Sequence, residues 1–308
     1  MLKKASYRRI IIASLSLLIL LIIYFFPSKI SYKEKITYIE NPKIPIYLLN
    51  KNNYIIRTNI ASTTNDNENL IREIIEILTI GSIKSSYMPN DFIPIIPKNT
   101  KLLNFEIKNN ILFLDFNDKL LDIEKEKETK LLESLTYSLT EIKGINKISI
   151  KINNKDINKF KSGTIIPKYL DKSIGINKKY NIKSIKNTNK TTIYYMSKTI
   201  ENLMYYIPIT KITNDDEEKI EIIIKELKSN PIHETNLISY LATSSNLTNY
   251  ELLENKMILS FNNLLIANLK NKDILEEVKY SIALSVRDTY NVNEIIFDIQ
   301  NKKEKFSI

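Results

Sequence analysis

Hydrophobic and polar positions in residues 44–81 follow two different periods, one after the other. Residues 44–49 and 54–60 are rich in β-branched and aromatic side chains and flank an Asn-Asn pair. This predicts a β-hairpin, because asparagine tolerates left-handed backbone angles. After a cap-rich segment at 63–67, apolar residues recur every three or four positions, which predicts an amphipathic helix that stops at Gly81.

The same two periods return after a proline-containing loop that ends at Pro97. The pattern predicts, in order, two strands, a helix and a third strand, at residues 101–107, 111–116, 124–142 and 148–152. In the last of these strands isoleucine alternates with serine and lysine, as it does in a half-buried strand. The predicted order of elements is therefore ββαββαβ, an α+β arrangement.

This order of predicted elements occurs twice along the chain. Residues 104–117 (NFEIKNNILFLDFN) and 249–262 (NYELLENKMILSFN) align without a gap and share six residues. The second copy predicts a strand pair, a helix, a strand pair, a helix and a strand, at residues 193–196, 203–209, 215–227, 251–261, 273–288 and 294–300. The last helices are aligned by matching Leu275, Tyr280 and Ser281 with Leu132, Tyr137 and Ser138. The repeat predicts two tandem domains, each with a core of its own.

The aligned strands also predict which face of each is buried. One face is apolar in both copies, with Leu112, Leu114 and Phe116 in the first and Met257, Leu259 and Phe261 in the second. The other face admits polar residues, since Asp115 is replaced by Ser260. We expect the apolar face to lie against the core of each domain.

The N-terminus has a pattern of its own. A basic segment at residues 1–9 precedes residues 10–26, IIIASLSLLILLIIYFF, which carry no charge. A helix of this length is roughly 26 Å long, close to the thickness of the bilayer core. This predicts a single transmembrane anchor with a cytoplasmic N-terminus and the bulk of the chain extracytoplasmic. The alternative is a cleaved signal peptide, although no small-x-small site follows the apolar run.

The distribution of charge along the chain indicates a linker between the two predicted domains. The net charge of +10 is concentrated at residues 1–39 and 154–190, whereas residues 40–153 are neutral and residues 191–308 are acidic. A nucleic-acid-binding face is therefore not expected on either domain. Residues 154–190 are predicted to be a solvated basic linker, with binding to an anionic wall polymer or to lipid headgroups as the functional alternative.

Candidate chemistry is sparse. The chain has no cysteine, which excludes disulfides, thiolate nucleophiles and zinc–thiolate sites, and its four glycines form no phosphate-binding loop. Asp115, Asp118 and Asp122 could suggest paired carboxylates, but their positions are typical of solvated loop acids. His233, the only histidine, follows Pro231 in a loop and has no nucleophile motif around it. No catalytic residue, metal site or cofactor is predicted.

The tyrosines are read as packing residues. Tyr194, Tyr195, Tyr205 and Tyr206 lie at strand spacing. Their first expected role is core and face packing, and their second is anchoring at an interface.

Residues 95–121, IIPKNTKLLNFEIKNNILFLDFNDKLL, resemble the GerMN domain of sporulation and spore germination proteins. That domain shows Pro-x-Gly-Thr-Lys-Leu-Leu before a strand, and the matching residues are Pro97, Thr100, Lys101, Leu102 and Leu103. Asn99 and Asn110 stand where the family has glycine, and residues 173–177 (SIGIN) resemble its inter-domain sequence. The resemblance spans about residues 40–305 as two copies, of which the second lacks the Pro-x-Gly-Thr-Lys element.

The resemblance implies a membrane-attached, extracytoplasmic protein of endospore-forming bacteria, whose domains are similar to the ring-building modules of secretion and sporulation assemblies. Its motif residues specify a fold and no active site. We therefore expect domains at 40–153 and 191–305, joined by 154–190. The expected function is a non-enzymatic scaffold whose partners are envelope or sporulation-complex proteins, and the alternative is binding to an anionic polymer.

Overall fold

The computed structural model describes residues 4–25, 43–62, 64–214, 216–229, 237–262, 265, 274–299 and 302–307. The chain divides into two compact units, residues 1–40 and 41–308. The described residues of the first unit form the helix α1 (Lys4–Phe25). The predicted transmembrane anchor at residues 10–26 falls on α1, and its described apolar side chains are exposed. No helix among the described residues combines the length and apolarity that crossing a membrane requires.

The first repeat follows the predicted order and adds short elements to it. Its elements are β1 (Lys43–Asn50), β2 (Ile55–Ala61), α2 (Asn67–Leu78), η1 (Lys84–Tyr87), β3 (Phe92–Ile93), β4 (Leu102–Lys108), β5 (Ile111–Phe116), η2 (Asp118–Leu121), α3 (Lys125–Leu139) and β6 (Lys147–Ile152). The second repeat contains β9 (Asn189–Lys198), β10 (Met204–Thr213), α4 (Lys219–Lys228), β11 (Leu247–Leu253), β12 (Lys256–Phe261), α5 (Glu276–Tyr290), β13 (Glu294–Ile299) and β14 (Lys302–Ser307).

Each repeat builds the same four-stranded sheet. The orders are β4-β5-β6-β7 and β11-β12-β13-β14, with β7 spanning Lys155–Asp156. In both sheets the first two strands are antiparallel and the central two are parallel, which requires a crossover, and α3 and α5 provide it. Both sheets also have a register irregularity at the equivalent place, between Leu102 and Asn104 and between Leu247 and Asn249.

The last residue of the repeated phrase holds the loop before it. The Asn117 side-chain amide donates to the carbonyl of Asn99 at 3.1 Å and accepts from the amide of Lys101 at 3.0 Å. In the second copy Asn262 does the same with Ser244 and Asn246 at 3.0 and 3.1 Å. The asparagine therefore has the same structural role in both copies, which is to fix the preceding loop.

Asparagine also replaces two glycines of the GerMN pattern. Asn99 and Asn110 have φ angles of 68° and 61°. This is the left-handed region, where glycine is the default residue and asparagine is the side chain that tolerates it best. The two departures from the family pattern thus leave the backbone conformation intact.

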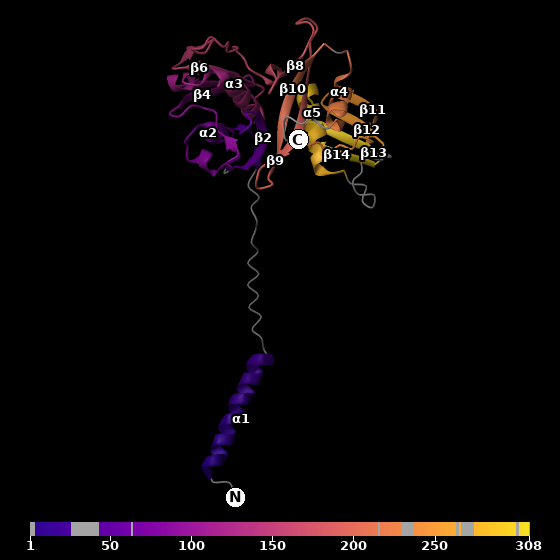
Figure 1. Ribbon diagram of the computed structural model, residues 1–308. Coiled ribbons are helices and arrows are strands. Elements are labelled where there is room, and N and C mark those ends of the chain that lie inside the picture. Colours follow the sequence, from indigo (N-terminus) through magenta and orange to yellow (C-terminus); the bar gives the residue numbers. More distant parts are fainter. Residues whose placement is uncertain are drawn as a thin grey trace. The chain divides into compact units, whose positions relative to one another are not determined.

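The β-hairpins of the two repeats join into one sheet. Its order is β3-β1-β2-β10, with β9 and β8 (Lys179–Asn181) also paired to β10. The link between repeats is the antiparallel pairing of Tyr206 in β10 with Arg57 in β2. Figure 1 shows β2, β9 and β10 between the two sets of helices.

The predicted buried face is confirmed. Leu112, Leu114 and Phe116 are fully buried, and Met257, Leu259 and Phe261 are 0–4% exposed. However, the buried apolar residues of both repeats form one continuous cluster, which corrects the expectation that each repeat has a separate core.

The segment at 154–190, predicted as a solvated linker, is exposed at most of its residues but packs against the core at a few apolar ones. Phe160, Ile166, Leu170 and Ile176 are buried, and η3 (Lys172–Ile174) contacts α3. The prediction followed the high lysine content of the segment. It overlooked that an apolar residue recurs there every four to six positions.

The predicted alignment of the last helices is wrong by one helical turn. Ser138 of α3 accepts a hydrogen bond from the amide of Tyr47 at 2.9 Å, and Ser285 of α5 accepts one from the amide of Tyr194 at 2.9 Å. Ser285, and not Ser281, is therefore the equivalent of Ser138. Four residues are about one turn of helix, so both alignments place similar residues on the same face.

Candidate functional site

The two repeats meet at a pair of buried tyrosines. The hydroxyls of Tyr47 and Tyr194 lie 3.0 Å apart. Tyr47 donates to Glu141 at 3.2 Å, and Tyr194 donates to Asp288. In each repeat the tyrosine comes from the first strand of the hairpin and the acid follows the crossover helix or lies in its last turn, 94 residues later. The junction is therefore a contact between equivalent parts of the repeat.

Two cations join the two acids. The Arg287 guanidinium forms hydrogen bonds to both oxygens of Glu141 at 2.6 and 3.0 Å and reaches Asp288 at 2.9 Å. The Lys172 ammonium lies 2.7 Å from Glu141 and 3.0 Å from Asp288. Arg287 comes from the second repeat and Lys172 from the connecting segment. We call Tyr47, Glu141, Lys172, Tyr194, Arg287 and Asp288 the junction cluster.

Electrostatics shift the pKa values of the two acids and the two tyrosines of the cluster. Burial by itself would raise the pKa of Glu141, but Arg287 and Lys172 outweigh it and hold that pKa well below its usual range. The same two cations lower the pKa of Asp288 against the effect of burial. Burial, reinforced by these acids, raises the pKa of Tyr47 and of Tyr194. The acids thus remain ionised, and their charges are balanced by Arg287 and Lys172.

The segment that resembles the inter-domain sequence of the family ties the repeats together. Asn177 accepts from the amide of Ile55 at 2.8 Å and donates to the carbonyls of Ile55 and Pro208 at 2.6 and 2.8 Å. Gly175 has φ +73°, and a Cβ there would lie 3.1 Å from the Thr210 methyl carbon. Only glycine fits this approach of the segment to β10 without displacement.

A polar cleft of about 1170 Å³ opens beside the junction cluster. One wall is the α3–β6 connection, Thr140–Lys147, and the opposite wall is the equivalent α5–β13 connection with Asn291 and Asn293. Residues of 171–175 and 188–192, Thr210, Lys219, Asn255 and residues 287–289 complete the lining. The cleft is thus formed by both repeats and the segment between them.

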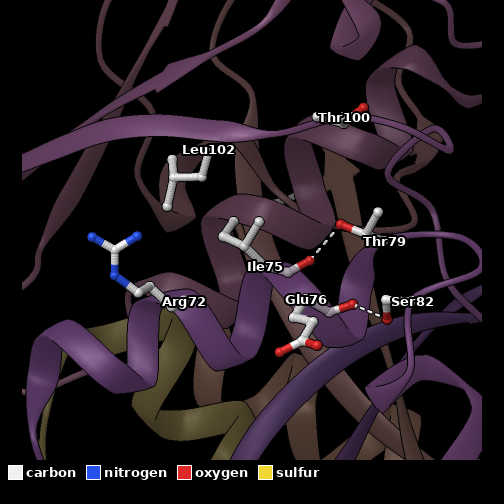
Figure 2. A pocket seen from close by; sticks show the side chains of 7 residues that line it. All are labelled: Arg72, Ile75, Glu76, Thr79, Ser82, Thr100 and Leu102. Atoms are coloured by element: carbon white, nitrogen blue, oxygen red, sulfur yellow. Dashed lines mark hydrogen bonds between the residues drawn. The ribbon is translucent and has the colours of Figure 1, made fainter.

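A smaller hollow of about 270 Å³ lies between α2 and β4 (Figure 2). Several of its polar groups already have structural roles. The Thr79 hydroxyl donates to the carbonyl of Ile75 at 2.6 Å, Ser82 donates to the carbonyl of Glu76 at 2.5 Å, and the Arg72 guanidinium lies 4.9 Å from the centre of the Phe105 ring. These contacts end α2 and hold it against β4, whereas the buried Thr100 hydroxyl, which also lines the hollow, has no hydrogen-bond partner among the described residues.

Two sheet edges remain open to a partner. β4 and β11 are the first strands of their four-stranded sheets, and most of their residues are exposed. The two-residue turn after Lys108 sets the register, so that Phe105 and Ile107 direct their backbone N–H and C=O groups away from β5. The two-residue turn after Leu253 sets the same register, so Tyr250 and Leu252 direct their backbone N–H and C=O groups away from β12. The repeat therefore presents the same open edge twice.

The three aspartates considered from sequence have different surroundings. Asp115 accepts from the amide of Asn154 at 2.8 Å, while Asp118 is exposed. Asp122 pairs with Lys161 at 2.5 Å and with Lys119 at 3.2 Å, and these hydrogen bonds lower its pKa. His233 lies outside the described residues. The part of the chain that the structure describes contains no group of three or more His, Cys, Asp or Glu side chains able to hold a metal ion.

The tyrosine prediction holds in part. Tyr194, Tyr195 and Tyr205 are buried, and Tyr206 lies half-buried at the strand pairing between repeats. The junction cluster itself was missed, because Glu141, Lys172, Arg287 and Asp288 each look like ordinary surface charges in the sequence. A signal was present in the recurrence of Tyr and acid at the same separation in both copies.

A tandem-repeat α+β protein with a shared ionic junction is thus the class that the fold and site define. Residues 45–158 match the Germane family model, described as sporulation and spore germination. This match covers the first repeat, and the chain as a whole is similar in sequence and fold to proteins with tandem GerMN domains.

Two relatives from Bacillus subtilis are similar along most of the chain. The spore germination protein GerM is 27% identical over 266 residues, which cover 84% of this chain and 72% of GerM. The solved structure of the tandem GerMN domains of the sporulation protein GerM is 25% identical, covers 86% of this chain and 96% of its own, and superposes with a TM-score of 0.75. Neither description names an enzymatic activity.

Proposed function

We propose that this chain is a non-enzymatic, membrane-attached protein that assembles with other envelope proteins during sporulation or spore germination. The observation that carries the proposal is the junction cluster. Its acids and Arg287 are largely buried, and together with Lys172 they balance one another's charge, so these charged groups hold the two repeats together.

Partner binding is supported by the two exposed strand edges. A strand of another protein can add to β4 or β11 through main-chain hydrogen bonds, which is a general route to assembly. Similarity to a sporulation protein of the same tandem architecture supports the setting of this role.

Membrane attachment through residues 1–26 is part of the proposal. Its support is the charge-free run at 10–26 after four basic residues, with its described side chains exposed in α1. In this arrangement the N-terminus is cytoplasmic and residues 43–308 lie outside. The test is fractionation. The full chain should sediment with membranes and need detergent for release, whereas a chain shortened in the culture medium near Phe26 would show a cleaved signal.

The role is tested by deleting the gene in a sporulating host. Deletion should block spore formation or a later spore stage, and re-expression of the full chain should restore it. The purified chain should not hydrolyse peptidoglycan. Cleavage of wall glycan that is abolished by Asp115→Asn or Asp118→Asn would replace the assembly role with an enzymatic one.

The alternative function is binding to an anionic wall polymer or to lipid headgroups through residues 154–190. One observation favours it. Lys179, Lys183 and Lys186 are exposed, and none forms an ion pair within the described residues. Other lysines of the segment are engaged, since Lys172 belongs to the junction cluster and Lys178 pairs with Glu133 at 2.9 Å. Binding through this segment should weaken steeply above 0.1 M salt, where the screening length is about 10 Å.

A further inference from the structure

The cleft beside the junction cluster combines features that no structural role explains. Its two main walls are the equivalent loops that follow α3 and α5, so the tandem packing of the repeats itself creates the space. A cavity made by joining two domains is a common location for a ligand site.

The charge of the cleft is strongly one-sided. Six basic and three acidic residues line it. The acids are all engaged, Glu141 and Asp288 by Arg287 and Lys172, and Asp171 by Lys147 at 3.2 Å. Lys143, Lys190 and Lys219 remain, and none of them pairs with a carboxylate among the described residues. The cleft therefore presents three uncompensated positive charges.

The Lys190 ammonium is held in position at the cleft. It donates to the carbonyl of Ser173 at 2.8 Å, which fixes its direction and leaves its charge unneutralised. Lys143 is exposed on the first wall and Lys219 is half-exposed at the start of α4. The three cations thus come from three separate parts of the chain.

The uncharged residues of the lining indicate which kind of anion the cleft can bind. The lining contains five asparagines and five threonines and no aromatic side chain. Four of the threonine hydroxyls form hydrogen bonds within the protein, so Thr188 and asparagine amides such as Asn146, Asn291 and Asn293 are the groups that can meet a hydroxyl-rich ligand. Recognition of single-stranded nucleic acid depends on stacking of bases on aromatic rings, so this lining disfavours a nucleic acid. It fits a chain that carries anions on a polyol or sugar backbone.

The size and shape favour a polymer over a small anion. Pockets for single small molecules have volumes of about 300–1000 Å³. The cleft exceeds this range at about 1170 Å³. A flat lipid surface reaches only exposed faces, whereas a flexible polymer can enter a cleft.

We propose that the inter-repeat cleft binds a segment of an anionic, hydroxyl-rich polymer, with Lys143, Lys190 and Lys219 contacting its phosphodiester or carboxylate groups. This rests on the alternative function stated above, anionic-polymer binding, and moves its site from the exposed lysines of 154–190 to the cleft. It does not depend on the assembly role.

The test compares three triple variants of the full chain in detergent. The cleft variant is Lys143→Gln, Lys190→Gln and Lys219→Gln. The segment variant is Lys179→Gln, Lys183→Gln and Lys186→Gln. The control, Lys98→Gln, Lys108→Gln and Lys125→Gln, removes the same charge from exposed sites that do not line the cleft. Binding is measured at 0.05 M salt to poly(glycerol phosphate), to carboxylate-bearing glycan strands, and to phosphatidylglycerol vesicles.

The cleft variant should lose about tenfold or more in affinity for at least one of the two polymers, while the control and the segment variant change less than about threefold. The polymer affected identifies phosphodiester or carboxylate as the anion. Replacement of the same three lysines by arginine should retain binding.

Three results overturn the proposal. Equal loss in all three variants would show a nonspecific charge effect. Loss confined to the segment variant would keep the alternative function and remove the cleft from it. Absence of polymer binding, with or without binding to vesicles, would reject both the cleft site and polymer binding, and would leave the assembly role to be judged by the gene deletion.

Discussion

At the scale of single residues, the junction cluster shows why two charged domains can share a buried surface. Arg287 has 10% of its side chain exposed, and Glu141 and Asp288 have 9% and 1%. Burying such groups is costly unless each finds a partner, and here each finds at least two.

Removal of Arg287 should therefore be far more damaging than its share of the contacts suggests. Arg287→Met leaves Glu141 and Asp288 with Lys172 as the main cation, and we expect a loss of about 3–5 kcal/mol in the free energy of unfolding. Urea unfolding monitored by circular dichroism measures it. Lys127→Met removes an exposed ion pair with Glu124 and should change stability by less than about 1 kcal/mol. Equal effects of the two changes would contradict a buried, interdependent cluster.

The cluster should also make stability depend on acid pH. Because the folded-state pKa values of Glu141 and Asp288 are depressed, their contribution is present above the ordinary carboxyl range and is lost as the pH falls through the folded values. Unfolding free energies measured from pH 6 to pH 2 should decline. The decline should be shallower for Glu141→Gln combined with Asp288→Asn. Asp122→Asn, at an exposed site, should leave most of the slope, and a slope unaffected by the junction variant would contradict the assignment.

Two glycines offer a matched test of the inter-repeat segment. Gly163 and Gly175 both have positive φ, at +98° and +73°, but a Cβ on Gly163 meets nothing within 4 Å whereas one on Gly175 meets Thr210 at 3.1 Å. We expect Gly163→Ala to cost about 1 kcal/mol from backbone strain and Gly175→Ala about 2–4 kcal/mol. Thr210→Ser, which keeps the hydroxyl and removes the nearby methyl, should recover part of the loss in Gly175→Ala. Similar costs at both glycines would show that the close approach is unimportant.

At the scale of elements, the strands were predictable and their partners were not. The alternation in residues 111–116 and its repetition in 256–261 gave the buried face directly, because side chains alternate between the faces of a strand. The period of a helix repeats every turn, so the register of α5 against α3 had two similar solutions and the prediction took the wrong one. The union of the two hairpins depends on one pairing between residues far apart in the chain, and no local pattern encodes it.

The confirmed face makes a quantitative prediction. Phe116→Ala should cost about 3–5 kcal/mol, as buried aromatic truncations do, and Phe261→Ala a similar amount. Phe113, on the opposite face of β5 and only half-buried, is the matched control and should cost clearly less. Chemical unfolding of the three variants measures the difference. A cost at Phe113 equal to that at Phe116 would mean that the faces were wrongly assigned.

At the scale of the whole molecule, residues 41–308 form one unit with a continuous core, a shared sheet and a neutral buried junction. The candidate site could not be assembled from the sequence, because its residues are far apart in the chain. Glu141 and Asp288 lie 147 positions apart in the chain, and only the packing of the repeats brings their partners together. The surface carries two equivalent strand edges, and these are the features that the assembly role uses.

The most direct test of the assembly role is the count of heat-resistant spores in a sporulating host whose only copy of the gene carries an altered edge. Ile107→Pro and Leu252→Pro remove outward N–H groups and block strand addition, and proline is tolerated at such edge positions. The matched strain carries Asp115→Asn and Asp118→Asn. If the chain acts by assembly through its edges, the proline strain should fall toward the count of the deletion strain, with the protein still present at normal levels, while the aspartate strain matches wild type. A normal count in the proline strain together with a deletion-like count in the aspartate strain would contradict the account.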